Sequence, residues 1–245
     1  MILEVCCGNR ASVDAAVSGG ASRIELCSHL ELDGLTPAWK DLQYARSQYP
    51  LLKIHVLIRP RGGNFVYSAA EVAAMCAEID TALSMGADGI VIGALTASGD
   101  VDVPAMEAMM ESVSNFDLLG FLCHSATDDN ILGRSVSVTF HRAFDVCRKP
   151  FEALSQIISL GCSRILTSGQ AATAIEGASM IRSLQEKAGS RLTILAGGGV
   201  NPSNVASLVR LSGCREVHAS ASALIDGQKV TQSATVAAIL ASLSF

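Results

Sequence analysis

The stretch Gly20-Ala21-Ser22-Arg23-Ile24-Glu25-Leu26 decides the fold, because similar phrases return along the chain before other apolar runs. The further copies begin at Gly86 and Gly161 and, more loosely, at Gly213. In each copy the glycine follows a helical pattern, where it can end the helix in a left-handed turn. The apolar residues after it are typical of a short buried strand. The repeat therefore predicts a helix followed by a strand, used four times.

Four more apolar runs lie between these copies and complete a set of eight predicted strands. They cover residues 3–6, 54–58, 136–140 and 192–195. Helices are expected near residues 9–18, 37–48, 69–85, 102–114, 149–160, 171–187, 202–211 and 232–243. Strict alternation of helices with Val/Ile/Leu-rich strands indicates a parallel sheet covered by helices. The strand count, the repeat and the length favour a single α/β domain over residues 1–245, a closed (βα)8 TIM barrel rather than an open doubly wound sheet.

Capping residues predict where several helices begin. Pro37 and Pro202 are expected in first turns, behind Thr36 and Asn201 as N-caps. Ser68, with a glutamate three residues later, has the spacing of a capping box.

Two segments depart from the regular alternation. Residues 115–135 are expected to form a long connection between the fourth helix and the fifth strand, with an extra short element around residues 118–123. Residues 226–229 are expected to join the eighth strand directly to the last helix.

The composition argues against several partners. A net charge of −5 disfavours nucleic acid, because binding to its backbone needs a basic face. No uninterrupted apolar run is long enough to cross a membrane. The first residues are typical of a strand and lack the basic and apolar regions of a signal peptide, so a cytoplasmic location is expected. The eight cysteines are then expected to be free thiols.

Alternation along each strand predicts which side chains face the barrel interior, since neighbouring residues lie on opposite faces. In the first two strands the apolar residues should pack on helices. The residues expected to face inward are then Glu4, Cys6, Glu25 and Cys27. Later strands are expected to present on shared faces Arg59 and Arg61, Thr139 and His141, and Glu216, His218 and Ser220. Cys7 should point the other way and pack against helices.

The inward set carries both signs of charge. Buried charges are costly unless they are paired, so one interpretation is a structural ion-pair network that fills the barrel. The other is a functional site, because active sites of this fold lie at the C-terminal ends of the strands, where these residues gather. We favour the site, since a core without a function would be apolar.

A glycine-rich loop at the same end indicates an anion site. Gly197-Gly198-Gly199 follows the seventh strand and leads into a helix N-terminus, where exposed backbone N–H groups can hold an anion. The loops after strands 7 and 8 form the common phosphate site of such barrels. Thr167 and Ser168, after the sixth strand, add two hydroxyls, and Arg61 adds a positive charge. A triple glycine alone is weak evidence, because many turns of this kind carry it.

Cys6 and Cys27 suggest a second chemistry. They end adjacent strands on the inner face, and neighbouring strands lie about 4.8 Å apart. Two thiolates at that spacing can bind Cu(I) in a near-linear arrangement. The alternative is that both thiols pack as small apolar side chains. Zinc is disfavoured, because no CxxC or HxxxH pair is present to complete a tetrahedral set.

Eight stretches, in order from residue 2 to about residue 220, form a highly specific pattern. They are Leu3-Glu4-Val5-Cys6, residues 20–27, Gly34-Leu35-Thr36-Pro37, residues 58–68, residues 139–145, Arg164-Ile165-Leu166-Thr167-Ser168-Gly169, Gly197-Gly198-Gly199-Val200 and Glu216-Val217-His218. Together they resemble the CutC-type copper homeostasis protein family.

The resemblance implies a TIM-barrel fold, a cytosolic location, a homodimer or larger homo-oligomer, and a role in copper handling. It also implies that Cys6 and Cys27 are the Cu(I) ligands. Further residues expected at the mouth are Glu4, Arg142, Asp145 and His218.

Three departures from the family pattern bear on the site. Asn64 stands where the family has aspartate, which removes a carboxylate from the mouth. The connection at residues 115–135 is longer than usual, and the stretch after His218 is shorter than in relatives.

Two main hypotheses for function follow. In the first, the two inward thiols bind Cu(I) in the cytosol. In the second, the protein is an enzyme acting on a small anionic or phosphorylated substrate held by the triple glycine. His141 would then be the general acid or base, with Arg59 and Arg61 as electrophilic partners. Glu25 would be a second proton carrier or would orient His141. A scaffold role ranks last, because aromatic residues are few.

Overall fold

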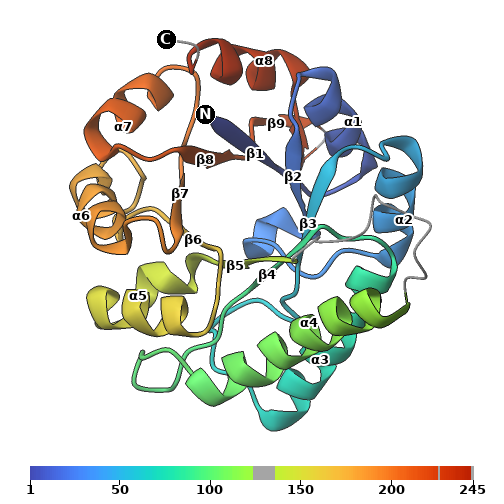
Figure 1. Cartoon of the computed structure of the whole chain (residues 1–245). Helices are drawn as coiled ribbons and strands as arrows, with labels where there is room; N and C mark the ends of the chain where they lie inside the picture. The colour runs from blue at the N-terminus through green and yellow to red at the C-terminus, as the bar shows by residue number, and fades with distance from the viewer. Residues whose placement is uncertain (124–135, 226, 244–245) are drawn as a thin grey trace.

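The computed structural model describes residues 1–123, 136–225 and 227–243, and its centre is a closed barrel of eight parallel strands (Figure 1). Each strand pairs with the next along the chain, and the eighth pairs with the first to close the ring. The strands are β1 Ile2–Cys7, β2 Arg23–Leu26, β3 Lys53–Leu57, β4 Gly89–Ile92, β5 Ser137–Phe140, β6 Arg164–Thr167, β7 Thr193–Gly197 and β8 Glu216–Ala219. The predicted (βα)8 TIM barrel is confirmed.

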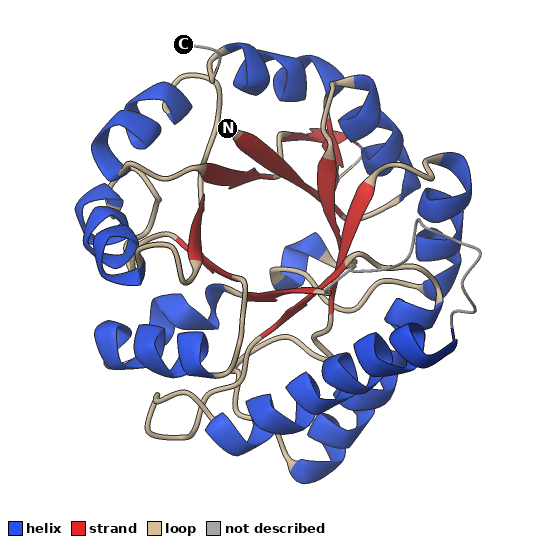
Figure 2. Cartoon of the chain, in the orientation of Figure 1, coloured by secondary structure: helices blue, strands red, loops and turns tan. Residues whose placement is uncertain are grey.

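Helices surround the barrel on its outer side (Figure 2). In the described part of the chain they are α1 Arg10–Ser18, α2 Trp39–Gln48, α3 Ala69–Ser84, α4 Val103–Cys123, α5 Pro150–Ser159, α6 Ala178–Ala188, α7 Val205–Ser212 and α8 Ser233–Ala241. Two short 3₁₀ helices follow strands: η1 Leu30–Leu32 after β2 and η2 Arg142–Val146 after β5. None of the described helices is long and apolar enough to cross a membrane.

The predicted alternation of side chains is confirmed in the first two strands. Ile24 and Leu26 are fully buried in the main apolar cluster, which lies between the barrel and its helices. Cys6 and Cys27 lie instead with Leu57 in a small separate cluster. The helices therefore cover one apolar face of the strands, and the opposite face is left for the polar and sulfur-bearing residues.

One predicted helix start is confirmed and two are wrong. α3 begins behind Ser68, which forms the expected capping box. α2 begins at Trp39 and α7 at Val205, so Pro37 and Pro202 lie before these helices rather than in their first turns. The two proline positions instead belong to the preceding loops.

The expected N-caps are used within those loops. Thr36 Oγ1 accepts the backbone N–H of Arg59 at 3.0 Å, which ties the loop after β2 to the end of β3. Asn201 Oδ1 accepts the backbone N–H of Ser203 at 2.9 Å and closes a local turn. Each side-chain oxygen is therefore engaged before the helix begins.

Two other helix boundaries differ from prediction. α6 begins at Ala178 rather than near residue 171, because Thr173 and Glu176 close a turn with their own side chains and backbone N–H groups. α4 continues unbroken to Cys123, so the expected helix end near residue 114 and the separate element at residues 118–123 are wrong. No proline or glycine falls between residues 114 and 119 to stop that helix. The remainder of the predicted connection, residues 124–135, lies outside the described residues.

A hairpin follows β8, so the predicted direct connection to the last helix is wrong. β9 Ser222–Ile225 and β10 Gln228–Thr231 pair in antiparallel fashion. Gly227, with φ of +77°, supplies the left-handed conformation that a tight hairpin turn needs. Thr231 Oγ1 donates to the carbonyl of Ser220 at 3.2 Å, which fastens the base of the hairpin to the barrel.

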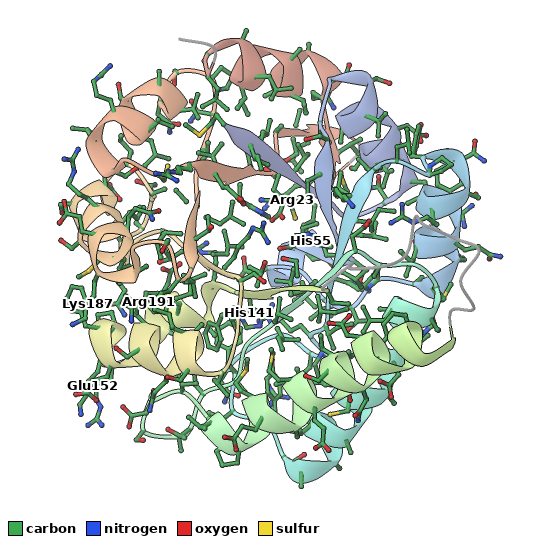
Figure 3. The ribbon with its side chains drawn as sticks, viewed as in Figure 1. Arg23, His55, His141, Glu152, Lys187 and Arg191 are labelled. Carbon is green, nitrogen blue, oxygen red and sulfur yellow. The ribbon has the colours of Figure 1, made fainter. Side chains whose placement is uncertain are left out.

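Charged side chains fill the part of the barrel near the N-terminal ends of the strands (Figure 3). Arg23 lies between two carboxylates and forms an ion pair with Glu4 and another with Glu216. Glu216 also pairs with Arg164, whose Nε lies 2.8 Å from Oε2. Glu4, Arg23 and Glu216 are all buried, and each has a partner of opposite charge, the condition under which buried charges are tolerated. This layer is an ion-pair network.

Replacing Arg23 by methionine should destabilise the fold by about 3 to 5 kcal/mol, because it removes the cation shared by two buried carboxylates. Urea denaturation measures the loss. The matched control is Arg10→Met, which breaks a more exposed pair with Asp41 and should cost less than about 1 kcal/mol. Equal, small losses in both variants would contradict a structural role for the network.

Candidate functional site

A cavity of about 490 Å³ opens at the C-terminal mouth of the barrel, and we call it the mouth cavity. The residues predicted for the site that line it are Cys6, Glu25, Arg59, His141, Arg142, Asp145, Gly198, Gly199 and His218. Those that do not line it are Glu4, Cys27, Arg61, Thr167, Ser168 and Gly197. A smaller hollow of about 260 Å³ beside α5 contains none of them. The mouth cavity therefore gathers most of the predicted residues from strands far apart in sequence.

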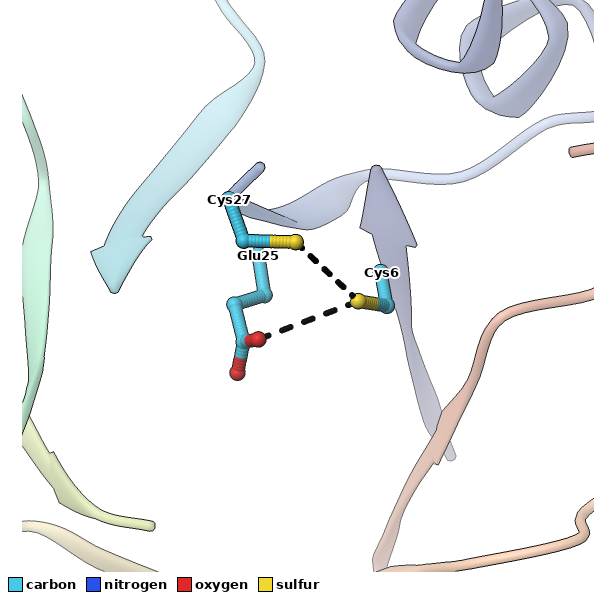
Figure 4. Close-up of side chains that lie close together, drawn as sticks. All are labelled: Cys6, Glu25 and Cys27. Atoms are coloured by element: carbon cyan, nitrogen blue, oxygen red, sulfur yellow. Dashed lines mark hydrogen bonds between the residues drawn. The ribbon is translucent and has the colours of Figure 1, made fainter. Parts of the chain in front are cut away.

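The thiols of Cys6 and Cys27 face each other (Figure 4), and Cys6 lines the mouth cavity. Their Sγ atoms lie 3.5 Å apart, and Cys6 Sγ lies 3.8 Å from Glu25 Oε1. The pairing of β1 with β2 produces this arrangement, because it places Cys6 opposite Glu25 and brings the next inward residue, Cys27, just beyond. Cys7 faces the helices, as predicted.

Both inward thiols are held in the protonated form. The hydrogen bond with Cys27, followed by burial, raises the pKa of Cys6 well above its usual range. The pKa of Cys27 is also raised, although the hydrogen bond with Cys6 opposes this, because burial and the nearby Glu25 outweigh it. A metal ion that binds here must therefore displace protons.

A second cluster adjoins the thiols and is built around the buried carboxylate of Glu4. His218 Nδ1 lies 2.9 Å from Glu4 Oε1, and His55 Nδ1 lies 3.2 Å from Oε2. Burial alone would raise the pKa of Glu4, but the hydrogen bond with His218, the close contact with His55 and the charge of Arg23 hold it well below its usual range. Burial would lower the pKa of His218, but Cys6, Glu4 and Glu25 raise it well above the usual range. Glu4 is therefore ionised and His218 is a cation.

Glu25 lies between the two clusters and differs from Glu4 in its ionisation. It is 5 % exposed and lines the mouth cavity. Burial raises its pKa to about 7. Among the described residues, no arginine contacts Glu25 to offset its loss of water, whereas Arg23 contacts Glu4. A carboxyl group with this pKa can both take up and release a proton near neutral pH.

Arg59 is a buried cation without a carboxylate partner among the described residues. It is 4 % exposed, and its guanidinium donates to the carbonyl oxygens of Leu32, Gly34 and Gly63 at 2.8, 2.9 and 3.1 Å. Its ζ carbon lies 5.0 Å from the centre of the Phe65 ring, and its Nε has no partner. The positive charge is fixed beside the mouth cavity and is not neutralised by any carboxylate in the described part of the chain.

Arg61 does not join Arg59. Its guanidinium pairs with Glu71 and lies over the Tyr67 ring, outside the mouth cavity. The two arginines were expected on one face of an extended strand, but β3 ends at Leu57. Beyond that residue the period-two alternation no longer applies, because the backbone has left the sheet.

His141 offers an uncharged donor to the same cavity. Its Nδ1 accepts the backbone N–H of Ala143 at 3.2 Å, so the proton of the neutral ring sits on Nε2, which is buried without a partner. Burial, together with the charge of Arg59, lowers the pKa of His141 to about 3. The ring fits only because residue 93 is glycine, since a Cβ there would lie 2.6 Å from it. At neutral pH His141 can donate a hydrogen bond, but it does not gain a second proton.

The triple glycine borders the mouth cavity through Gly198 and Gly199. Both have positive φ, +109° and +72°, which favours glycine at these positions. Their backbone N–H groups have no acceptor within the described ranges of the chain. A Cβ on Gly198 would lie 3.7 Å from the Arg142 guanidinium carbon, so a cation approaches this loop.

The two hydroxyls predicted beside this loop are already engaged within the chain, and that of Ser168 donates to the carbonyl of Ala171 at 2.6 Å. Thr167 Oγ1 and the backbone N–H of Ser168 both donate to Asp145 Oδ1. Asp145 also accepts from Arg142 Nε at 2.7 Å. A carboxylate of the chain therefore occupies the position that Thr167 and Ser168 were expected to offer to a ligand.

Two contributors to the site were missed from the sequence. His55, a partner of Glu4, precedes Leu57 by two residues on β3, so strand alternation could have revealed it. Lys229 lines the mouth cavity from β10 and could not be placed without the hairpin. The Asp226-Gly227 dipeptide between two apolar runs is the sequence signal for such a turn.

These features define a TIM-barrel protein with a cavity lined by charged residues at the C-terminal ends of its strands. The chain belongs to the CutC family, whose model matches residues 1–132 and 130–223. A CutC family protein of Chromobacterium violaceum is 46% identical over 220 residues, which cover 90% of this chain and 81% of that protein. One of Bacteroides fragilis is 44% identical over 220 residues, with coverages of 90% and 80%.

A solved structure agrees with this assignment. The structure of a proposed copper homeostasis protein, CutC, from Streptococcus agalactiae matches with a TM-score of 0.78 at 29% identity. The match covers 90% of this chain and 98% of that one. The family and its barrel are therefore supported by sequence and by structure.

The pKa of Glu25 gives stability a pH dependence. Between an unfolded pKa of about 4.3 and a folded pKa of about 7, only the folded state holds this proton. The stability of the parent should therefore fall as pH rises through this window. Relative to the parent, a Glu25→Gln variant should gain up to about 3 kcal/mol between the ends of the window, measured by urea denaturation at several pH values.

A substitution at an exposed glutamate is the control for this measurement. Glu107→Gln, on the outer face of α4, should differ from the parent by the same small amount at every pH. If the difference for Glu25→Gln were equally flat, Glu25 would not carry the shifted proton.

Proposed function

We propose that this protein binds Cu(I) through Cys6 and Cys27 at the mouth of the barrel and takes part in copper handling in the cytoplasm. The observation that carries the proposal is the pair of sulfur atoms 3.5 Å apart beside the mouth cavity. The name of the Streptococcus agalactiae relative agrees with it. The described cysteines are free thiols, which suits a reducing compartment.

The donor chemistry fits a soft monovalent ion. Thiolates favour Cu(I) over harder cations, and the two sulfurs come from adjacent strands that hold them in place. The donor atoms of Cys6, Glu25 and Cys27 lie within 4.8 Å of one another. On binding, Cu(I) would replace the thiol protons, which pass to solvent.

Replacement of both cysteines by alanine should abolish stoichiometric capture of Cu(I) in anaerobic competition with bicinchoninate. In the parent, capture should tighten as pH rises by up to about tenfold per pH unit for each proton released, because the raised pKa values keep both thiols protonated. The control is Cys162→Ala, a buried thiol outside the mouth cavity, which should bind as the parent does. Unchanged capture by the Cys6→Ala, Cys27→Ala variant would refute the proposal.

We also propose, as a second candidate, that the mouth cavity accepts a small anionic substrate for an enzymatic reaction. The observation that favours it is Arg59, a buried cation that has no carboxylate partner among the described residues. The N–H groups of Gly198 and Gly199, which have no acceptor among the residues that the structure describes, would hold an anionic group at another wall of the cavity.

The pKa values redistribute the roles expected for this reaction. His141, neutral at ordinary pH, would serve as a hydrogen-bond donor beside Arg59, to stabilise charge that develops on a substrate oxygen. Glu25, whose pKa is about 7, would be the proton carrier. A carboxylate base facing a cation and a neutral imidazole is suited to proton transfer next to a carbonyl group.

Binding of 2-phosphoglycolate, a small anion with both carboxylate and phosphate groups, tests the second candidate. Calorimetry should detect it in the parent, and Arg59→Gln should weaken it about 10- to 100-fold, as expected for a lost charged hydrogen bond. Arg61→Gln, two residues away but outside the mouth cavity, should bind as the parent does. No binding to the parent, or equal binding by both variants, would exclude this anion site.

A further inference from the structure

The strand order places a histidine on the other side of Cys6 from Cys27. β1 lies between β2 and β8 in the barrel. Cys6 pairs with Glu25 on β2, and Cys27 follows the end of that strand. On the other side, His218 on β8 pairs with Glu4, which is two residues before Cys6. Cys6, Glu25 and His218 all line the mouth cavity.

The thiol of Cys6 and the ring of His218 interact, because His218 lowers the pKa of Cys6 and Cys6 raises the pKa of His218. The donor atoms of Glu4, Glu25 and His218 lie within 4.8 Å of one another, as do those of Cys6, Glu25 and Cys27. Glu25 belongs to both groups and therefore links the two sulfur donors to the nitrogen donor of His218.

The orientation of the His218 ring is fixed by a carboxylate that water does not reach. Glu4 is fully buried, and its Oε1 lies 2.9 Å from Nδ1 of His218. Nε2 is on the opposite edge of the ring from this contact, and His218 lines the mouth cavity. Metal-bound histidines are held in this way, with one nitrogen on the metal and the other on a carboxylate.

We infer that His218 is a third ligand of the metal held by Cys6 and Cys27, through Nε2, and that Glu4 is its positioning residue. The inference rests on the proposed function and concerns the same site. Imidazole is a good ligand for copper, and two thiolates with one imidazole make a three-coordinate Cu(I) site rather than a linear one. His218 coordinates as the neutral ring, so its extra proton leaves for solvent with the thiol protons.

His55 shows that a contact with Glu4 alone does not make a ligand. Its Nδ1 also reaches Glu4, at 3.2 Å, but the other edge of its ring faces Gly89 on β4, where a Cβ would lie 2.9 Å from Nε2. His55 does not line the mouth cavity. It is therefore the matched control for His218.

X-ray absorption at the copper edge, on protein carrying one equivalent of Cu(I), tests the inference. The parent should show two sulfur ligands and one nitrogen ligand with the outer-shell scattering of an imidazole ring. His218→Gln should lose the imidazole signal and bind Cu(I) about 10- to 100-fold more weakly in competition with bicinchoninate. His55→Gln should retain both the signal and the affinity.

The outcomes separate the two proposals. Failure of the parent to capture Cu(I) refutes the proposed function and this inference with it. Capture with sulfur ligands alone, or an imidazole signal that survives in His218→Gln, refutes the inference and leaves the thiol site standing. Should His218→Gln fold poorly, the parent spectrum still decides, and added imidazole should restore the nitrogen signal in His218→Ala.

Discussion

The fully buried carboxylate of Glu4 is the constraint on which the rest of the barrel interior depends. A charge without water must be paired, and three cations or potential cations surround this one: Arg23, His55 and His218. Through Arg23 it joins the ion-pair network near the N-terminal ends of the strands. Through His218 it reaches the thiols at the mouth. One side chain therefore couples the structural layer of the barrel to the candidate metal site.

The mouth itself divides into a neutralised half and an unneutralised half. On the side of β1, β2 and β8, histidine, carboxyl and thiol groups satisfy one another by hydrogen bonds. On the side of β3 and β5, Arg59 Nε and His141 Nε2 are buried and have no hydrogen-bond partner among the described residues. The first half suits a thiophilic cation and the second an anion. Both halves open into one cavity, so a bound metal and a bound anion would be neighbours.

Elements with a strong repeating pattern were predictable, while those set by loop contacts were not. The eight strands followed from apolar runs and from the repeated glycine phrase, and the Ser68 capping box followed from its spacing. The starts of α2 and α7 could not be predicted in this way, because the side-chain oxygens of Thr36 and Asn201 accept hydrogen bonds within the loops and do not cap the helices. The hairpin after β8 was not predicted, although its Asp-Gly signal is present, because its two strands have four residues each and pair with each other outside the barrel.

By itself, the sequence determined the barrel and the inward direction of Cys6, Glu25 and Cys27, because strand alternation is a local property of the backbone. Only the tertiary structure decided which inward residues meet. Closure of the ring sets His218 opposite Glu4, although the two residues lie near opposite ends of the sequence. The tertiary structure also decided which charges are paired and which groups are ionised. The pKa of a buried group depends on neighbours from other strands and on its loss of contact with water.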